Sequence, residues 1–286
     1  MKTRMTAFVA LVFCAFTLGF TPASQAAEDF KGNWTIRSSK QPGQVHFGLI
    51  HHRDGGRSHS ESDWPVSEFK GLDLAPQAKR DVNFNITSDA GRFDCEGYLK
   101  DGEGAGAFRF TADAEYAKSM GALGFNGIDE EMQYAMAVHD VSLEFAKSIK
   151  GEKLSDLTTE MLLAFRIHGV TPQFIRDIRA AGLTADDSDK LVAFRIHGVT
   201  PEMVREVRKS GLTVSEDELI AFRIHGVTPA FIAQVEKLGY PRLEPDQLIA
   251  MRIHGVTPEY ITDMKARGLK NLTVDQLVNL RIHGIN

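Results

Sequence analysis

The tetrapeptide Arg-Ile-His-Gly occurs five times in the second half of the chain, and this repetition constrains the fold more than any other feature. The intervals between successive copies are 29, 28, 29 and 29 residues. A fixed period of about 20 to 50 residues is typical of stacked copies of one supersecondary unit. The sequence therefore predicts a repeat array that takes up more than half of the protein.

Each copy of the repeat predicts a pair of short helices, as the last copy shows. Thr257 is a good N-cap, and Pro258 suits the first helical position because its missing N–H needs no partner there. Gly268 is suited to the left-handed conformation that ends a helix. The second helix starts with a capping box, Thr273–Gln276, and Gly284 ends it. Its expected apolar face consists of Leu277, Val278, Leu280 and Ile282.

Two weaker copies precede the five clear ones. His139 lies 29 residues before His168, and Asp113–Tyr116 occupies the Thr-Pro-Glu-Tyr position of the earliest copy. Terminal repeats are expected to be degenerate, because they meet a different neighbour on one side. We therefore predict six helix pairs over residues 113–286.

Residues 27–112 follow the strand period of two instead of the helical period of about 3.6. Val82, Phe84 and Ile86 alternate with polar residues, and clusters rich in Gly and Asp separate such runs. This pattern predicts half-buried antiparallel strands joined by tight turns. The expected strands are Asn33–Ser38, Gln44–His52, Arg57–Asp63, Asp81–Ile86, Phe93–Gly97 and Gly106–Thr111. We predict a small antiparallel β-sandwich or curled meander, hence an α+β protein. Since no linker follows the last strand, the sheet and the first helix pair are expected to pack together.

Residues 1–26 have the features of a signal peptide. Lys2 and Arg4 form a basic start, Ala7–Phe20 is an uncharged apolar run, and small residues precede Ala27. A membrane anchor is the alternative, but the apolar run is shorter than the ~20 residues that span a bilayer. We therefore predict cleavage before Ala27, a periplasmic or secreted protein, and no stable membrane insertion afterwards.

Cleavage would make the net charge of −5 more negative, because the removed segment holds two of the 33 basic residues and none of the 38 acidic ones. This charge argues against a general nucleic-acid-binding role. Cys95 would become the single cysteine, so no intrachain disulfide could form. We expect it to be a small buried residue on a strand, with an intermolecular disulfide as the alternative.

The repeat core resembles a known kind of bacterial repeat, as Leu219–Val235 and Leu248–Ile261 show. It is similar to the tandem C-terminal repeats of membrane metallopeptidases of the antirepressor, β-lactam-sensor type, and to those of small exported bacterial proteins. The resemblance covers about residues 113–286 and implies an extracytoplasmic module that is accessory to envelope sensing. The peptidase activity does not carry over, since the chain contains no His-Glu-x-x-His motif.

One histidine per repeat should line up along the array. This histidine row comprises His168, His197, His225, His254 and His283. A metal-binding or pH-sensing role is one interpretation. The preferred interpretation is structural capping, because a histidine in the last turn interacts favourably with the carbonyls at a helix end.

One arginine per repeat forms a second row. This arginine row comprises Arg166, Arg195, Arg223, Arg252 and Arg281. The simple interpretation is ion pairing between neighbouring repeats, with acids such as Asp177, Glu206 or Asp263. The functional interpretation is a positive ridge that binds a carboxylate-rich or phosphorylated partner.

Another candidate site lies in the β-rich part. If Arg53–Gly56 is a four-residue turn, His46, His52 and His59 share one face of a hairpin, with Glu61 within reach. Three imidazoles and a carboxylate form a zinc-type ligand set. Exposed histidines near a turn, without a metal, are the alternative interpretation.

The sequence contains no nucleophile elbow, phosphate loop or dinucleotide fingerprint, so we predict neither enzyme activity nor a cofactor. The predicted function is a protein-binding or scaffolding module. The alternative is a metal- or small-ligand-responsive sensor component that uses His46, His52 and His59.

A protein partner or a second copy is expected at the last helix pair. No further repeat follows to cover its outer face, and uncovered apolar surface usually marks an interface. The residues expected to line this face are Tyr260, Met264, Leu277, Leu280 and Ile282.

Overall fold

An antiparallel sheet followed by a helical array makes up the fold, so the predicted α+β class is confirmed. The computed structural model describes residues 30–53, 56–75 and 78–285. The predicted signal segment lies outside the described residues. Within these ranges, no helix has the length and apolar character needed to cross a membrane.

Six strands form a single sheet in the order β3-β2-β1-β6-β5-β4. The elements of this part are β1 (Lys31–Ser38), β2 (Gln44–Arg53), β3 (Gly56–Pro65), the 3-10 helix η1 (Val66–Glu68), β4 (Arg80–Ser88), β5 (Gly91–Lys100) and β6 (Glu103–Ala112). Two three-stranded meanders meet where β1 pairs with β6. The β2–β3 hairpin has the predicted register, with His52 opposite Arg57 and Ile50 opposite His59.

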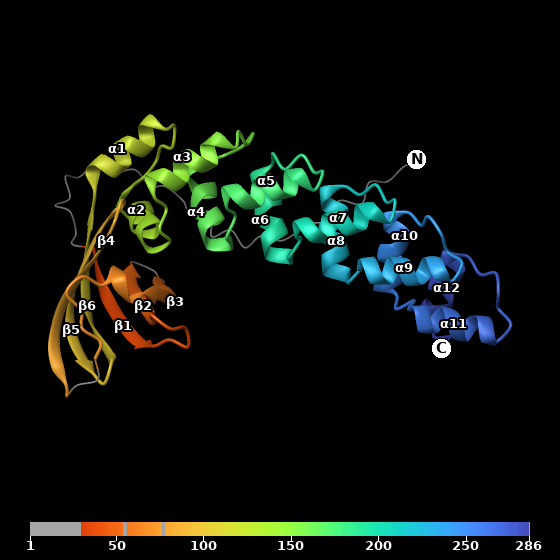
Figure 1. Cartoon of the computed structure of the whole chain (residues 1–286), viewed down its shortest axis with the longest axis horizontal. Coiled ribbons are helices and arrows are strands. Elements are labelled where there is room, and N and C mark those ends of the chain that lie inside the picture. Colours follow the sequence, from red (N-terminus) through yellow and green to blue (C-terminus); the bar gives the residue numbers. More distant parts are fainter. Residues whose placement is uncertain (1–29, 54–55, 76–77, 286) are drawn as a thin grey trace.

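The sheet is curled (Figure 1), and its buried apolar side chains form a core. Phe69, in the connection between β3 and β4, packs edge-on against Phe47 of β2, with ring centroids 5.0 Å apart. The same ring lies 5.8 Å from Phe84 of β4. Because β2 and β4 belong to opposite halves of the sheet, this connection closes the curl. Trp34 is fully buried inside it, and Gly97 gives it room, since a Cβ at Gly97 would lie 2.7 Å from the indole ring.

The rest of the described chain forms twelve helices in six pairs, as predicted. The first helices of the pairs are α1 (Ala114–Ala122), α3 (Leu143–Gly151), α5 (Pro172–Ala180), α7 (Pro201–Lys209), α9 (Pro229–Lys237) and α11 (Pro258–Ala266). The second helices are α2 (Glu130–Val138), α4 (Thr159–His168), α6 (Ser188–His197), α8 (Glu216–His225), α10 (Pro245–Ile253) and α12 (Val274–Ile282).

Local chemistry sets the helix ends as expected. The Thr171 hydroxyl accepts a hydrogen bond from the N–H of Phe174 at 3.1 Å, and Thr257 does the same for Tyr260 at 3.2 Å. Each bond satisfies a donor that has no partner within its helix. At the other end, Gly169 follows α4 with φ of 73°, a left-handed conformation that costs glycine little.

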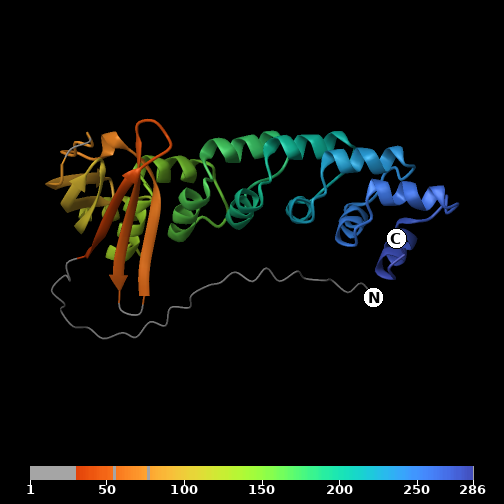
Figure 2. The same ribbon diagram turned by 90° about the horizontal axis from the view of Figure 1, so that it is seen from below.

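The helices form two layers. Figure 2 shows the first helices α3, α5 and α7 following one another along the array, with the second helices beneath them. Contacts run within each layer, so α5 packs on α7, α4 on α6, and α6 on α8. Fully buried residues such as Phe165 and Phe194 of the second helices and Ile175 of the first helices fill the space between the layers. This is the one-dimensional stacking of a solenoid.

The sheet and the array share one hydrophobic core. The ring of Tyr134 in α2 lies 4.5 Å from Phe30 and 5.8 Å from Phe93. Beside it, Gln133 donates from Nε2 to the carbonyl of Ala90, between β4 and β5, at 2.7 Å. The expected packing of the sheet against the first helix pair is therefore confirmed.

Candidate protein-interaction surface

The arginine row reaches back to the end of the preceding second helix. Arg195 in α6 donates from Nε to the carbonyl of His168, the last residue of α4, at 3.2 Å. Equivalent bonds join Arg166 to His139 (3.0 Å), Arg223 to His197 (3.1 Å) and Arg252 to His225 (3.3 Å). Because the last carbonyls of a helix have no partner within it, a cation from the next repeat serves as their cap.

The arginine also lies between an aromatic ring and a glycine. The guanidinium of Arg195 lies 5.0 Å from the ring centroid of Phe174 in the intervening first helix. A Cβ on Gly169 would lie 2.8 Å from its Nη2 atom. The glycine is thus needed for its left-handed backbone and for the space above it. Similar ring contacts join Arg166 to Phe145, Arg252 to Phe231 and Arg281 to Tyr260.

These cap contacts differ from the ion pairs expected with acids of the first helices. Asp177 accepts from Gln173 instead, at 2.7 Å, and Asp263 pairs with Arg267 at 2.8 Å. Spacing alone could not show this, because the guanidinium follows the stacking of the second helices.

The first helices are capped in the same direction. A cation near the end of a first helix donates to the carbonyl that ends the preceding first helix. The pairs are Lys150 with Leu123, Arg179 with Glu152, and Lys265 with Leu238. Both layers are therefore joined by side chains that point toward the N-terminal end of the array.

The isoleucine beside each arginine points away from the core. Leu162 and Phe165 are fully buried and define the inward side of α4. At about 100° per residue, Ile167 falls on the opposite side of the helix. Its five copies are half-exposed: Ile167 49%, Ile196 55%, Ile224 52%, Ile253 53% and Ile282 56%. We call them the isoleucine ridge. Ile282 therefore does not share the buried side of α12 with Leu277, although the sequence predicted one apolar face for both.

Aliphatic side chains extend the isoleucine ridge inward. One turn before each isoleucine lies a partly buried aliphatic residue that packs against the core. These residues are Leu163, Val192, Ile220, Ile249 and Val278. The outward face of the second-helix layer is thus apolar along five consecutive helices.

Exposed acids occupy the N-terminal ends of the same helix faces. Seven residues before each isoleucine is a carboxylate, and we call these five the acidic row: Glu160, Asp189, Asp217, Asp246 and Asp275. The positive end of each helix dipole stabilises them. Asp217 pairs with Lys190. Among the described residues, the other four have no ion-pair partner. Residues seven apart lie on one helix face, so the acidic row runs beside the isoleucine ridge.

The histidine row follows the opposite edge of the isoleucine ridge. Its members are exposed or partly buried. His283 donates from Nδ1 to the carbonyl of Asn279 at 2.8 Å, which is a capping contact. At the ends of α4, α6 and α8, the backbone carbonyl of the histidine is capped by the next arginine. Among the described residues, no candidate metal cluster contains a histidine of this row.

In the last helix pair, Ile282 is exposed as expected, but the other residues expected to line an open apolar face are buried or partly buried. Met264 is only 1% exposed, so its prediction as a lining residue is wrong. The ring of Tyr260 is covered by Arg281 at 4.7 Å, and its hydroxyl donates to the carbonyl of Ile285 at 2.9 Å. Leu280 is partly buried. Neighbouring side chains of the same repeat therefore close most of this face.

The β2–β3 hairpin brings part of the predicted histidine cluster together. Glu61 lies 3.6 Å from His46 and 3.3 Å from His59, and Arg37 donates to it at 2.8 Å. Burial opposes ionisation of Glu61, but Arg37, His59 and the hydrogen bonds from both histidines outweigh it and lower the pKa of the carboxyl. The side chain of His52 lies outside the described residues. A metal ion at this site would need the negative charge of Glu61, and Arg37 already neutralises that charge.

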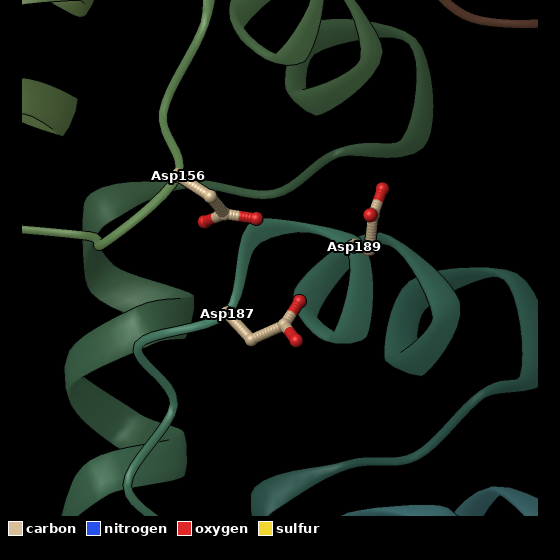
Figure 3. A group of neighbouring side chains, drawn as sticks. All are labelled: Asp156, Asp187 and Asp189. Atoms are coloured by element: carbon tan, nitrogen blue, oxygen red, sulfur yellow. The ribbon is translucent and has the colours of Figure 1, made fainter.

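In the described part of the chain, the ligand atoms that lie close enough to share a cation belong to three aspartates. The oxygens of Asp156, Asp187 and Asp189 lie within 4.8 Å of one another at the start of α6 (Figure 3). Asp187 accepts from the N–H of Lys190 and Asp156 from the N–H of Ser188, both at 3.0 Å. The capping of α6 accounts for two carboxylates, and Asp189 belongs to the acidic row. The repeat pattern does not indicate this group, because Asp156 comes from a different repeat than Asp187 and Asp189.

Comparison with known proteins gives no relative: no protein-family model matches the chain, and no curated protein matches it. The resemblance to the repeats of sensor-type metallopeptidases therefore rests on the repeat residues alone.

Proposed function

We propose that the protein is an exported, non-enzymatic binding module whose helical array holds a protein partner on the isoleucine ridge. One observation carries the proposal, namely five half-exposed isoleucines at the same position of five stacked helices. Single exposed apolar residues are common, but a contiguous exposed apolar surface usually marks an interaction site.

Divergence between the repeats supports this proposal. One residue after the acidic row, the repeats carry Met161, Lys190, Glu218, Gln247 and Gln276, so the copies differ freely at this position. At the isoleucine ridge all five copies are identical. The cap contacts explain the constant arginine and glycine, and burial explains the valine that follows in four of the five copies, the fifth having Ile285 there. Packing within the array does not need an isoleucine that is half in water, so its retention points to a contact outside the chain.

The export part of the proposal rests on residues 1–26. Intact-mass measurement of protein recovered from the periplasm or medium tests it. A chain that begins at Ala27 supports export with cleavage, and a chain that keeps Met1 in the membrane fraction contradicts it.

Site-specific photo-crosslinking in cells tests the binding surface. A photoreactive residue at Ile224 should give a discrete protein adduct. The same residue at Glu206, an exposed position of the first helix α7, serves as the control. The adduct at Ile224 should disappear when Ile196 and Ile253 are changed to serine, with circular dichroism unchanged. Equal adducts at both positions, or none at either, would reject the ridge as the binding surface.

A sensor component is the second candidate, and the contacts of Glu61 with His46 and His59 favour it. Elemental analysis of the purified protein should then find zinc or a similar ion at one per chain. The ion should be lost in a His46→Ala, His59→Ala variant. A metal-free protein that does not take up zinc in dialysis would eliminate this candidate.

A further inference from the structure

We infer that the occupant of the isoleucine ridge is an amphipathic helix with one basic flank, lying along the array across the second helices. This inference rests on the proposed function of the ridge in protein binding. It names the kind of partner, and three independent features of the surface carry it.

The first feature is the lack of backbone partners on the surface. The ridge consists of side chains that cannot form hydrogen bonds, and the N–H groups of its isoleucines are paired within α4, α6, α8, α10 and α12, so the surface presents no strand edge. An extended or polyproline segment placed there would bury its own N–H and C=O groups without partners. A helix satisfies these groups internally, so it can press an apolar face against the ridge at no such cost.

The second feature is the spacing of the ridge. Neighbouring packed helices lie about 8–10 Å apart, so successive isoleucines recur at about this distance along the layer. Seven residues of an α-helix rise about 10.5 Å. A partner helix with an apolar seam repeated every seven residues would therefore meet one ridge isoleucine per heptad. Covering all five second helices needs about 28 residues, or four heptads.

The third feature is charge. The acidic row borders the isoleucine ridge at the N-terminal ends of the second helices, and Asp217 is the member that an internal lysine already pairs. Nearby Asp156 and Asp187 add to the negative charge at α6. The opposite border carries the histidine row. A partner helix is therefore matched when lysines or arginines flank its apolar seam on the side of the acidic row.

A second copy of this chain fits the surface less well. If two arrays met ridge to ridge in antiparallel orientation, their acidic rows would face each other and repel. In parallel orientation both sheets would lie at the same end. Figure 2 shows that the sheet extends past the neighbouring second helices on the side that faces away from the first helices. The two sheets would therefore collide before the ridges met.

Three synthetic peptides of about 28 residues test the inference, with fluorescence anisotropy as the measurement. All carry the same leucine seam at heptad spacing. The first has lysines along one flank, the second has glutamates there, and the third is the lysine peptide with two central prolines that break the helix. The lysine peptide should bind the purified full-length protein most tightly, and its affinity should fall at high salt.

Two double variants locate the contact. Ile224→Ser with Ile253→Ser should weaken the lysine peptide by about tenfold or more. Asp189→Asn with Asp246→Asn should weaken it about threefold to tenfold at low salt and should reduce its salt dependence. Glu202→Gln with Glu259→Gln removes acids from the same helical position of two first helices, away from the ridge. This matched control should leave affinity unchanged.

Each other outcome overturns a defined part of the inference. Equal binding of the glutamate peptide would reject the basic flank, and equal binding of the proline peptide would reject the helix. If no peptide binds while the serine changes at Ile196 and Ile253 abolish the crosslink at Ile224, the ridge binds protein of another form. Light scattering of the unmodified protein and the isoleucine variants tests the second copy, since a dimer lost on substitution would make the ridge a self-association surface.

Discussion

Replacing Gly169 by alanine tests whether the repeat glycine and the next arginine act as one unit. Gly169 has φ of 73°, a region that costs an alanine about 1 kcal/mol. The new Cβ would also lie 2.8 Å from Nη2 of Arg195. The guanidinium must then leave its place over the carbonyl of His168 and the ring of Phe174. The substitution therefore combines local backbone strain with the loss of a contact between repeats.

The backbone strain and the lost arginine contacts each contribute a definite share of the free energy of unfolding. An exposed hydrogen bond from a cation and an exposed cation–π contact together contribute about 1–2 kcal/mol. Gly169→Ala should therefore cost about 2–3 kcal/mol in free energy of unfolding. Gly211 offers the matched control, because its φ is 81° and nothing lies within 4 Å of its Cβ position. Gly211→Ala should cost only the backbone part, about 1 kcal/mol.

A double-mutant cycle with Arg195→Ala separates the two parts. Once the guanidinium is absent, Gly169→Ala should cost about 1 kcal/mol, as at Gly211. Urea unfolding followed by circular dichroism reports the helices. Tryptophan fluorescence reports the sheet separately, because Trp34 and Trp64 both lie in strands. If Gly169→Ala costs the same with and without Arg195, the proposed contact contributes nothing and the reasoning fails.

Three further predictions concern the isoleucine ridge, the pKa of His139 and the stacking of the helix pairs. Ile224→Ser should change the free energy of unfolding by about 1 kcal/mol or less, because the side chain is half-exposed. Phe222→Ala removes a fully buried ring and should cost about 3–5 kcal/mol. Urea titration compares the two variants, and equal costs would contradict the outward position of Ile224. Burial lowers the pKa of His139 below its ordinary 6.5, so the unfolded chain takes up this proton first and stability should fall as the pH drops below about 6.5. His139→Gln should flatten that part of a plot of melting temperature against pH; a profile identical to that of the unmodified protein would rule out His139 as the cause. Deleting residues 258–286 should lower the melting temperature of the helices modestly and leave tryptophan fluorescence unchanged, whereas loss of the sheet would contradict an array held by neighbour contacts.

The parts of the fold that could be predicted depend on residues close together in the chain. Helix ends follow from single caps such as Thr257 and Gly169, whose partners lie within one turn. The register of the β2–β3 hairpin follows from the length of its turn, which fixes the residue opposite His59. Both are decided before any long-range packing is known.

The candidate site depended on information that the local pattern does not contain. Ile282 continues the apolar pattern of its helix, and its outward position is set by the rotation of the helix that buries Leu277. Met264 is buried together with Tyr260 and Ile261 of the same helix, and the local pattern does not show which side of that helix is covered. The acidic row could have been found from its spacing of seven residues before each isoleucine. Its significance became visible only once both rows lay on one surface.

The cap contacts give the array a direction and explain the position of the sheet. Each repeat supplies cations to the helices of the repeat before it, so the first pair must be held by something else on its open side. The sheet does this: Asp89, in the β4–β5 turn, accepts from the N–H of Leu143 at 2.9 Å, and Ala90 accepts from Gln133. In α2 the ridge position is taken by Val138, which is 8% exposed. The sheet therefore acts as the missing neighbour of the array. The isoleucine ridge begins at Ile167 because that is the first ridge position that the sheet does not cover.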